Sequence, residues 1–219
     1  MRKQSIVTGE YYHIYNRGVD KRDIFSDKLD VHRFIESVCE FNKIDGIGSL
    51  TNLRKTRIES KALSKPLVAI VAYCFNPNHF HFILKQLVDG GIAKFMQKLQ
   101  GGYTYYFNIR NTRTGSLFQG TFKAHLMNNE NYFQKMLGYV NNNNEIHDIP
   151  KSKTDLVFSS SYEYETNNFK IVSKAEGERI LGIFNGSKIF LKHCKEIVSI
   201  VRKEKGKASL LEEEDNLQI

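Results

Sequence analysis

Residues 66–84 constrain the fold more than any other stretch, because two strand-like runs follow each other with only a short turn between them. PLVAIVAYCF at 66–75 is a continuous apolar run enriched in β-branched residues, a pattern typical of a strand buried on both faces. NPN at 76–78 has the chemistry of a turn, and HFHFIL at 79–84 has that of a returning strand. The sequence therefore predicts a β-hairpin.

Two further strands are predicted on either side of this hairpin. YYHIYNR at 11–17 is rich in aromatic residues and ends at Gly18, which indicates a strand followed by a turn. LFQGTFKAHLM at 117–127 alternates well enough for another strand, and Gly120 is expected to mark a bulge or a close approach of the backbone.

Helices are predicted between and after these strands. The first begins with Ser26 or Asp27 as its N-cap, and its apolar stripe consists of Val31, Phe34, Ile35, Val38 and Phe41. The second begins at Gly90-Gly91 and is expected to break or bend at Gly101-Gly102. Residues 129–144 are predicted to be helical again, and residues 150–165 irregular.

The order strand, helix, strand, strand, helix, strand is that of the split βαβ, ferredoxin-like fold. It predicts an α+β protein with an antiparallel sheet and helices packed on one face. Residues 43–65 are basic and punctuated by glycine and serine, so they are expected to form an exposed insertion. Amphipathic stretches near 174–184 and 187–203 predict a C-terminal helical extension with an acidic tail, which divides the chain into 1–165 and 166–219.

The charge of the chain favours polyanionic partners such as nucleic acid, because its formal net charge is +8 over 219 residues. The three cysteines, Cys39, Cys74 and Cys194, form no CxxC pair, and they are expected to be small buried residues in a reducing compartment. There is no signal-peptide h-region and no apolar run of the ~20 residues that span a membrane. A cytoplasmic protein is therefore expected.

The histidines of the hairpin carry the first chemical signal. Side chains alternate along a strand, so His79 and His81 share one face while Phe80 and Phe82 share the other. Imidazoles at such positions can converge on one metal ion, but they can equally be ordinary hydrogen-bonded residues. A metal site would also need further ligands.

A tyrosine and an asparagine on the helix predicted at 129–144 carry the second chemical signal. Tyr139 and Asn143 are offset by about 40° around a helix axis and about 6 Å along it, so both face the same neighbourhood. Tyr139 can also be a core residue with its hydroxyl at the rim. The asparagine run 141–144 is compatible with a fraying helix end and with a polar patch near a site.

Together these stretches resemble a known family. HFH after NPN is similar to the His-hydrophobic-His signature of the HUH endonucleases. YYHIYNRG, GSLFQGTFKAHLM and YFQKMLGYVNNNN resemble the first strand, the fourth strand and the catalytic helix of the REP-associated tyrosine transposase branch of the single-tyrosine HUH transposases. The resemblance covers roughly residues 8–165. Asn144 stands where that family usually has proline, and Asn76 where methionine is common.

The resemblance implies a DNA transposase that cleaves and rejoins single-stranded, hairpin-end DNA through a 5′-phosphotyrosine intermediate. Tyr139 falls on the nucleophile, and Asn143 on the residue that completes a metal site with His79 and His81. The bound ion would be Mg²⁺ or Mn²⁺. His125 and Glu145 remain alternative ligands.

Contacts to nucleic acid are expected from basic side chains near the first and fourth strands. The candidates are Arg17, Lys21, Arg22, Arg110, Arg113 and Lys123. Two other functions fit the same residues: a cleavage-inactive protein that binds hairpin DNA or RNA, and a metal-dependent hydrolytic nuclease. A monomer and a homodimer are equally compatible with the sequence.

Overall fold

The computed structural model describes residues 5–45, 65–147 and 149–207, with the side chains of 205–207 excepted. Most of the insertion expected at 43–65 and the acidic C-terminal segment lie outside these ranges. None of the helices in the described part of the chain combines the length and the apolar character that a membrane span needs.

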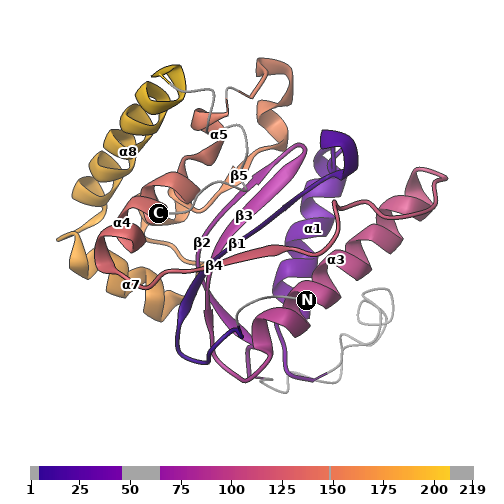
Figure 1. The fold of residues 1–219 in the computed structure, drawn as a ribbon, viewed down its shortest axis with the longest axis horizontal. Helices are drawn as coiled ribbons and strands as arrows, with labels where there is room; N and C mark the ends of the chain where they lie inside the picture. Colours follow the sequence, from indigo (N-terminus) through magenta and orange to yellow (C-terminus); the bar gives the residue numbers. More distant parts are fainter. Residues whose placement is uncertain (1–4, 46–64, 148, 208–219) are drawn as a thin grey trace.

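A five-stranded antiparallel sheet forms the centre of the protein (Figure 1). Its strands are β1 (Tyr11–Arg17), β2 (Val68–Asn76), β3 (His79–Gln86), β4 (Lys123–Leu126) and β5 (Phe158–Ser159), in the order β4-β1-β3-β2-β5. Each neighbouring pair is antiparallel. The predicted hairpin is confirmed, since β2 pairs with β3 from Val68↔Gln86 to Asn76↔His79. All nine residues of β2 are buried, as its continuous apolar run predicts.

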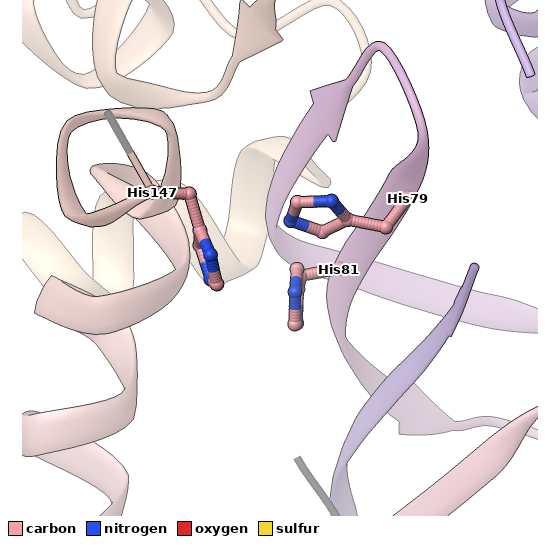
Figure 2. Close-up of side chains that lie close together, drawn as sticks. All are labelled: His79, His81 and His147. Atoms are coloured by element: carbon pink, nitrogen blue, oxygen red, sulfur yellow. The ribbon is translucent and has the colours of Figure 1, made fainter. Parts of the chain in front are cut away.

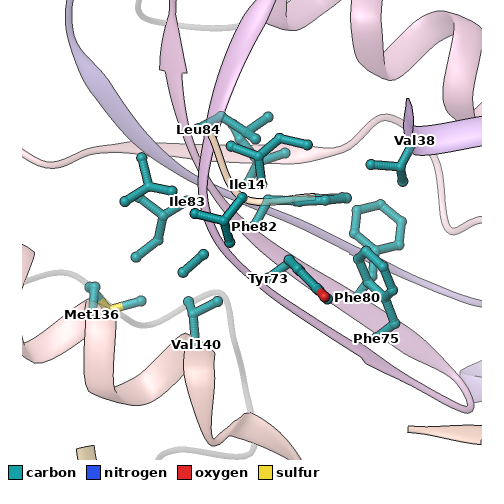
Figure 3. Close-up of a cluster of buried hydrophobic side chains, with 14 of the residues drawn as sticks. Ile14, Val38, Tyr73, Phe75, Phe80, Phe82, Ile83, Leu84, Met136 and Val140 are labelled. Atoms are coloured by element: carbon teal, nitrogen blue, oxygen red, sulfur yellow. The ribbon is translucent and has the colours of Figure 1, made fainter. Parts of the chain in front are cut away.

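One face of the sheet is covered by α1 (Lys28–Phe41) and α3 (Gly91–Arg110). Asp27 is the N-cap of α1, because its carboxylate accepts from the backbone N–H groups of Leu29 and Asp30. The rings of Phe34, Phe75, Phe80 and Phe82 pack between these helices and the sheet. Figure 3 shows the buried side chains on both sides of the strands. The phenylalanines of β3 therefore face the core, as its alternation predicts.

The break expected at Gly101-Gly102 is wrong, because α3 runs without interruption from Gly91 to Arg110. Glycine is needed at position 102 for helix packing and not for a break in the helix. A Cβ atom there would lie 2.7 Å from Cε2 of Phe41, so the absent side chain lets α1 and α3 pack closely. Nothing lies within 4 Å of a Cβ at Gly101.

The opposite face of the sheet is covered by α4 (Glu130–Asn141) and the single turn α5 (Asn143–Ile146). Asn129 caps α4 by accepting from the N–H of Tyr132. In Figure 3, Met136 and Val140 of α4 approach the sheet from the side of Ile83. The ferredoxin-like α+β class is confirmed. The expectation that helices pack on one face only needs correction, because α4 covers the face opposite to α1 and α3 (Figure 1).

The chain after residue 150 is more regular than expected. Residues 150–165 contain a 3₁₀ helix (Lys151–Leu156), β5 and the helix α6 (Ser161–Thr166). The two predicted C-terminal helices are confirmed as α7 (Lys174–Ile183) and α8 (Ser187–Lys207). Figure 1 shows α8 alongside α4, on the side away from the sheet. Buried side chains from Phe190 to Val201 join α8 to the rest of the core.

Two local expectations need correction. The fourth strand is short, and Gly120 lies before it with a φ of +67°. Nothing lies within 4 Å of the place that a Cβ atom would take at Gly120, so a left-handed turn and not a close approach favours glycine here. Among the cysteines, Cys74 and Cys194 are buried as expected, whereas Cys39 is exposed. Burial raises the pKa of the Cys74 thiol to about 12, which makes it a poor nucleophile.

Candidate metal centre and active site

The register of the strands gathers histidines on the face of the sheet that α4 and α5 cover. His79 and His81 occupy alternate positions of β3, and β1 pairs with β3 so that Arg17 lies opposite His79 and Tyr15 opposite His81. His13 lies opposite His125 of β4. All of these side chains alternate with core residues, so the same strands that bury phenylalanines on one side present imidazoles on the other.

Asn143 meets His79 as the sequence predicts. Oδ1 of Asn143 lies 2.9 Å from Nε2 of His79, and both residues are buried. His79 Nδ1 donates to Oδ1 of Asn78 at 2.6 Å, so neutral His79 presents a lone pair at Nε2. Two electron-rich atoms, an imidazole nitrogen and an amide oxygen, then face each other at hydrogen-bond distance, an arrangement that a cation between them would stabilise.

Asn76 orients this pair of donors. Its Nδ2 donates to Oδ1 of Asn143 at 2.8 Å and lies 2.9 Å from Nε2 of His79. The amide of Asn143 is therefore held with its oxygen toward His79. In the family that the sequence resembles, methionine is common at the position of Asn76. Here the amide of Asn76 supplies a hydrogen-bond donor that a methionine would lack.

His147 joins the cluster from the other side, and sequence reasoning missed it. One ring nitrogen from each of His79, His81 and His147 lies within 4.8 Å of the others. Figure 2 shows the three imidazoles converging, two from β3 and one from the turn after α5. His147 lies one turn beyond Asn143, a helical spacing that could have signalled it.

These donors fit a divalent metal ion. Three imidazole nitrogens and one amide oxygen provide four N/O ligands, with His79, His81 and Asn143 buried and His147 half-buried. The imidazole nitrogens lie within 4.8 Å of one another, close to the separation of about 3–4.5 Å that metal–ligand distances of about 2.0–2.2 Å allow. Among the described residues, no Cys, Asp or Glu belongs to this cluster. The donor set is therefore compatible with a divalent ion and unlike a structural zinc site rich in thiolates.

Tyr139 lies beside the cluster on α4. Its ring stands edge-on to the ring of His81, with centroids 5.7 Å apart and planes at 86°. It stands in the same way to His13, at 6.2 Å and 84°. The side chain is 8% exposed. The tyrosine, the two histidines of β3 and Asn143 are thus brought to one face of the sheet.

His13 was not singled out from the sequence, although it occupies an alternate position of the first strand. Its Nε2 lies 2.8 Å from Nδ1 of His81, so one imidazole donates to the other and Nε2 of His81 remains on the opposite edge of the ring. His13 also stacks with Tyr15, whose hydroxyl lies 3.3 Å from Nε2 of His125. Burial, with a smaller effect of Lys123, lowers the pKa of His125.

The two alternative ligands left open by the sequence lie outside the cluster. His125 contacts the hydroxyl of Tyr15 instead. The Glu145 carboxylate accepts a hydrogen bond from Nδ2 of Asn142 at 2.6 Å, which ties it to the backbone turn of α5.

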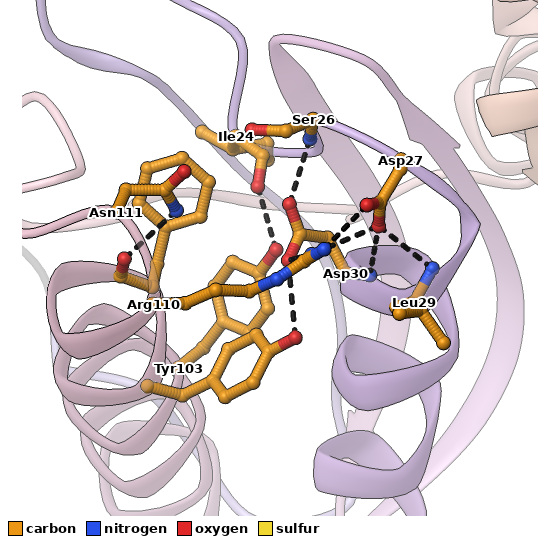
Figure 4. Close-up of polar contacts among 10 residues, drawn as sticks. Ile24, Ser26, Asp27, Leu29, Asp30, Tyr103, Arg110 and Asn111 are labelled. Atoms are coloured by element: carbon orange, nitrogen blue, oxygen red, sulfur yellow. Dashed lines mark hydrogen bonds and ion pairs between the residues drawn. The ribbon is translucent and has the colours of Figure 1, made fainter.

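The basic residues predicted to contact nucleic acid have different environments. Arg110 is engaged in ion pairs with Asp27 and Asp30 that join α3 to α1 (Figure 4). Its guanidinium holds the pKa of Asp27 at about 2. Arg113 donates to Asn108 and to the backbone of Ser116, within its own turn. Both arginines therefore stabilise the fold.

The other four lie nearer to the cluster. Arg17 and Lys123 are placed by register on the same face as His79 and Tyr15. Lys21 and Arg22 follow β1 in an exposed turn that contacts the β2–β3 hairpin, since Nδ2 of Asn78 donates to the carbonyl of Lys21. These positive charges border the face that carries the histidines.

Comparison with known proteins identifies the family. A family model described as "Transposase IS200 like" matches residues 6–143, well over half of the chain. The chain belongs to this transposase family. The matched segment includes both histidines of β3, Tyr139 and Asn143, whereas His147 and α8 lie beyond it.

The sheet and its helices resemble those of a solved transposase. A REP-associated tyrosine transposase bound to a REP hairpin aligns with a TM-score of 0.50 and 15% identity, covering 79% of this chain and 89% of that one. A tRNA(His) guanylyltransferase from Saccharomyces cerevisiae aligns with a TM-score of 0.36 and 11% identity, covering 89% and 81%. No curated protein sequence matches the chain.

Proposed function

We propose that this transposase cleaves and rejoins single-stranded DNA at hairpin ends by metal-assisted transesterification, with Tyr139 as the nucleophile. The observation that carries the proposal is the position of the Tyr139 ring, 5.7 Å from that of His81, beside a buried cluster of nitrogen and oxygen donors. A phenol needs activation to attack phosphate at neutral pH, because its pKa is ordinarily about 10. A neighbouring positive charge, such as a bound metal ion, is one source of this activation.

His79, His81 and Asn143 are the proposed metal ligands, and His147 is positioned to be a fourth. A bound Mg²⁺ or Mn²⁺ would polarise the scissile phosphate and offset charge on the departing oxygen. Imidazole ligands favour Mn²⁺ over Mg²⁺.

Three neighbouring side chains hold these ligands in orientation. Asn78 keeps the proton of His79 on Nδ1, Asn76 turns the oxygen of Asn143 toward the site, and His13 engages Nδ1 of His81. Such contacts fix the tautomer and angle of a ligand, and they typically change metal affinity by about 10–100-fold when removed.

In the proposed step, the Tyr139 oxygen attacks phosphorus and loses its proton to solvent. A tyrosyl–phosphate bond forms at the 5′ side of the break, and the bond from phosphorus to the 3′ oxygen breaks, which releases a 3′-OH after that oxygen gains a proton. One phosphodiester replaces another, so the reverse attack by a different 3′-OH rejoins DNA without ATP.

The proposed substrate is a single strand next to a hairpin. The related solved structure is that of a transposase bound to a REP hairpin. On this chain, Arg17, Lys21, Arg22 and Lys123 border the histidine face and can neutralise phosphates. Arg110 is the weakest candidate, because the carboxylates of Asp27 and Asp30 engage it. Arg113 already donates to a backbone carbonyl, as does Arg22.

Trapping of a covalent adduct tests the proposal. The protein is incubated with Mn²⁺ and end-labelled hairpin oligonucleotides with single-stranded flanks, and denaturing gels then separate free from protein-linked DNA. We expect an adduct that carries the 5′ phosphate, an equal amount of free 3′-OH product, and loss of both in Tyr139→Phe. Tyr132→Phe, which changes the other tyrosine of α4, is the matched control.

Other products would point to the other functions. A free 5′-phosphate with no adduct would indicate hydrolysis. Salt-sensitive binding that resists chelation and yields no cleavage would indicate a binding protein. Either result, obtained across a range of hairpin sequences, contradicts Tyr139 as nucleophile.

A further inference from the structure

Two of the hollows formed by the described residues lie along the seam between α5 and α8. One has a volume of about 430 Å³, and Asn144, Glu145, Thr154 and Arg202 are among the residues that line it. The other has a volume of about 470 Å³ and is lined by Glu145 and, on α8, by Lys195, Ser199, Arg202 and Lys203. Glu145 and Arg202 line both, so the hollows adjoin and form one surface, the α5–α8 groove.

Close packing against α4 fixes the position of α8. A Cβ atom at Gly138 would lie 2.7 Å from Cγ1 of Ile197 and 3.3 Å from Cα of Cys194, so only glycine permits this approach. Farther along, the guanidinium of Arg202 donates to the carbonyl oxygen of Glu145, with Nε at 3.1 Å. The groove is therefore built on ordered elements at both of its walls.

The groove is positively charged. Lys195, Arg202 and Lys203 are exposed along it, against a single lining carboxylate, that of Glu145. That carboxylate accepts a hydrogen bond from Asn142 and is thereby held to α5. The nearby Glu204 carboxylate lies 4.0 Å from Nζ of Lys135, outside the groove lining.

The groove also borders the candidate active site along the chain. Asn144 and Glu145 lie between Asn143 and His147, so the backbone turn that presents two metal-ligand candidates on one side forms the groove wall on the other. A strand that enters or leaves the site past α5 would meet the groove next. The α8 helix lies outside the segment that matches the family model, which ends at residue 143.

We propose that the α5–α8 groove binds the sugar–phosphate backbone of the single strand that flanks the cleavage site. This inference rests on the proposed function and adds a second binding surface to it. The positive charge of the groove indicates a polyanionic ligand. A row of cations beside a hollow can bind a chain of phosphates, and the release of the counterions of that chain increases the affinity. The groove then lengthens the stretch of single strand that the protein holds, without reading its bases.

Salt-dependent binding of single-stranded DNA tests the groove. A Tyr139→Phe parent, which removes covalent trapping, is titrated into a fluorescent single strand of about 20 nucleotides and mixed sequence at several salt concentrations. In this parent, Lys195→Gln with Lys203→Gln should weaken binding roughly tenfold at low salt, equally for different sequences. The slope of log affinity against log salt should become shallower by about 1.4, or about 0.7 for each phosphate contact.

The matched control is Lys188→Gln with Lys192→Gln. It makes the same change of charge on the same helix, but N-terminal to the groove, whose lining includes neither lysine. We expect binding within twofold of the parent. All four lysines are exposed, so thermal unfolding should be unchanged in both double variants.

The outcomes separate the two proposals. Equal losses in both double variants, or no loss in either, overturn the groove, because charge alone or no contact would then explain the data. A parent that binds no single strand refutes the groove and the proposed substrate together. Groove-dependent binding by a wild-type protein that forms no adduct supports the groove and refutes only the catalytic proposal.

Discussion

On one face of the sheet, the rings of Phe80 and Phe82 pack against Phe34 and Phe95 of the covering helices. On the other face, the imidazoles of His79 and His81, from alternate positions of the same strand, face Tyr139 and the α5 turn. The first face contains aromatic side chains in mutual contact, with Tyr73 and Tyr103 among the phenylalanines. The second contains hydrogen-bonded rings and amides.

One strand thus serves stability and chemistry at once. A period of two residues assigns Phe to one face and His to the other, so a change on either side leaves the other side's packing in place. Burial holds the imidazoles in position, and their hydrogen bonds to Asn78 and His13 limit how they rotate. Substitutions on the two faces of β3 can therefore separate these two contributions.

The largest effect is expected for His81→Ala. Loss of a proposed ligand should lower the rate of adduct formation on the order of 10³-fold, because a bound ion supplies several kcal/mol of transition-state stabilisation. Single-turnover assays with saturating Mn²⁺ measure it. Ile83→Val, the next position on the same face, is the control and should react at nearly the wild-type rate. A His81→Ala protein as active as this control would remove His81 from the site.

Phe82→Ala should lower the stability of the fold and leave the rate of adduct formation nearly unchanged, the reverse of His81→Ala. Its side chain is fully buried among aromatic rings, so truncation should lower the free energy of unfolding by about 3–5 kcal/mol. Urea unfolding measures the loss. Well below its melting temperature the variant should still form adduct at close to the wild-type rate. A selective loss of activity with little loss of stability would contradict the division between the two faces.

Much of this division could be predicted from the sequence. The alternation in HFHFIL assigns each residue to its face without knowledge of the fold, and the spacing of Tyr139 and Asn143 places both near one site. The contributions of His13 and His147 could not be predicted in the same way. His13 reaches His81 only through the register between β1 and β3, and His147 reaches the cluster only because the chain turns after α5.

The packing of the helices on the sheet could not be predicted from the sequence either. Helix periodicity shows that α4 has an apolar stripe but not which face of the sheet it covers. Gly101 and Gly102 look alike as helix breakers, and only the proximity of Phe41 distinguishes them. The division of the chain at residue 165 stays a prediction.

His147→Ala and Asn143→Ala test the extent of the metal cluster. If both side chains bind the ion, each change should weaken Mn²⁺ affinity by about 10-fold or more, since each removes one of four donors. Mn²⁺ titration followed by electron paramagnetic resonance measures the affinity without any DNA. His125→Ala is the matched control, because it lies on the same face but outside the cluster, and its affinity should change less than twofold. A loss of Mn²⁺ affinity in His125→Ala alone would indicate that the ion binds nearer to β4.

Three glycines test the packing on each side. Gly138→Ala should lower stability by about 1–3 kcal/mol, because its methyl group would overlap Ile197 of α8. Gly102→Ala should act similarly through Phe41 on the other face. Gly101→Ala has open space around it and should raise stability by about 0.5–1 kcal/mol through helix propensity. Thermal unfolding of the three variants gives the comparison, and equal effects at 101 and 102 would contradict the packing of α1 on α3.

The smallest effect is expected at the ion pair that joins the helices over the phenylalanine face. Arg110 holds the pKa of Asp27 at about 2, below the ordinary value of 3.8, so the carboxylate stabilises the fold above about pH 4 and loses this contribution as the pH falls toward 2. Asp27→Asn keeps the helix cap but removes the charge. Because the Asp27 side chain is 46% exposed, the variant should be less stable than wild type by under about 1 kcal/mol at pH 7. The difference should become much smaller as the pH falls to about 2 in urea unfolding. Adduct formation at pH 7 should not change, because Asp27 lies on the face of the sheet away from the histidines. A difference as large at pH 2 as at pH 7 would mean that Asp27 acts through packing and not through its charge.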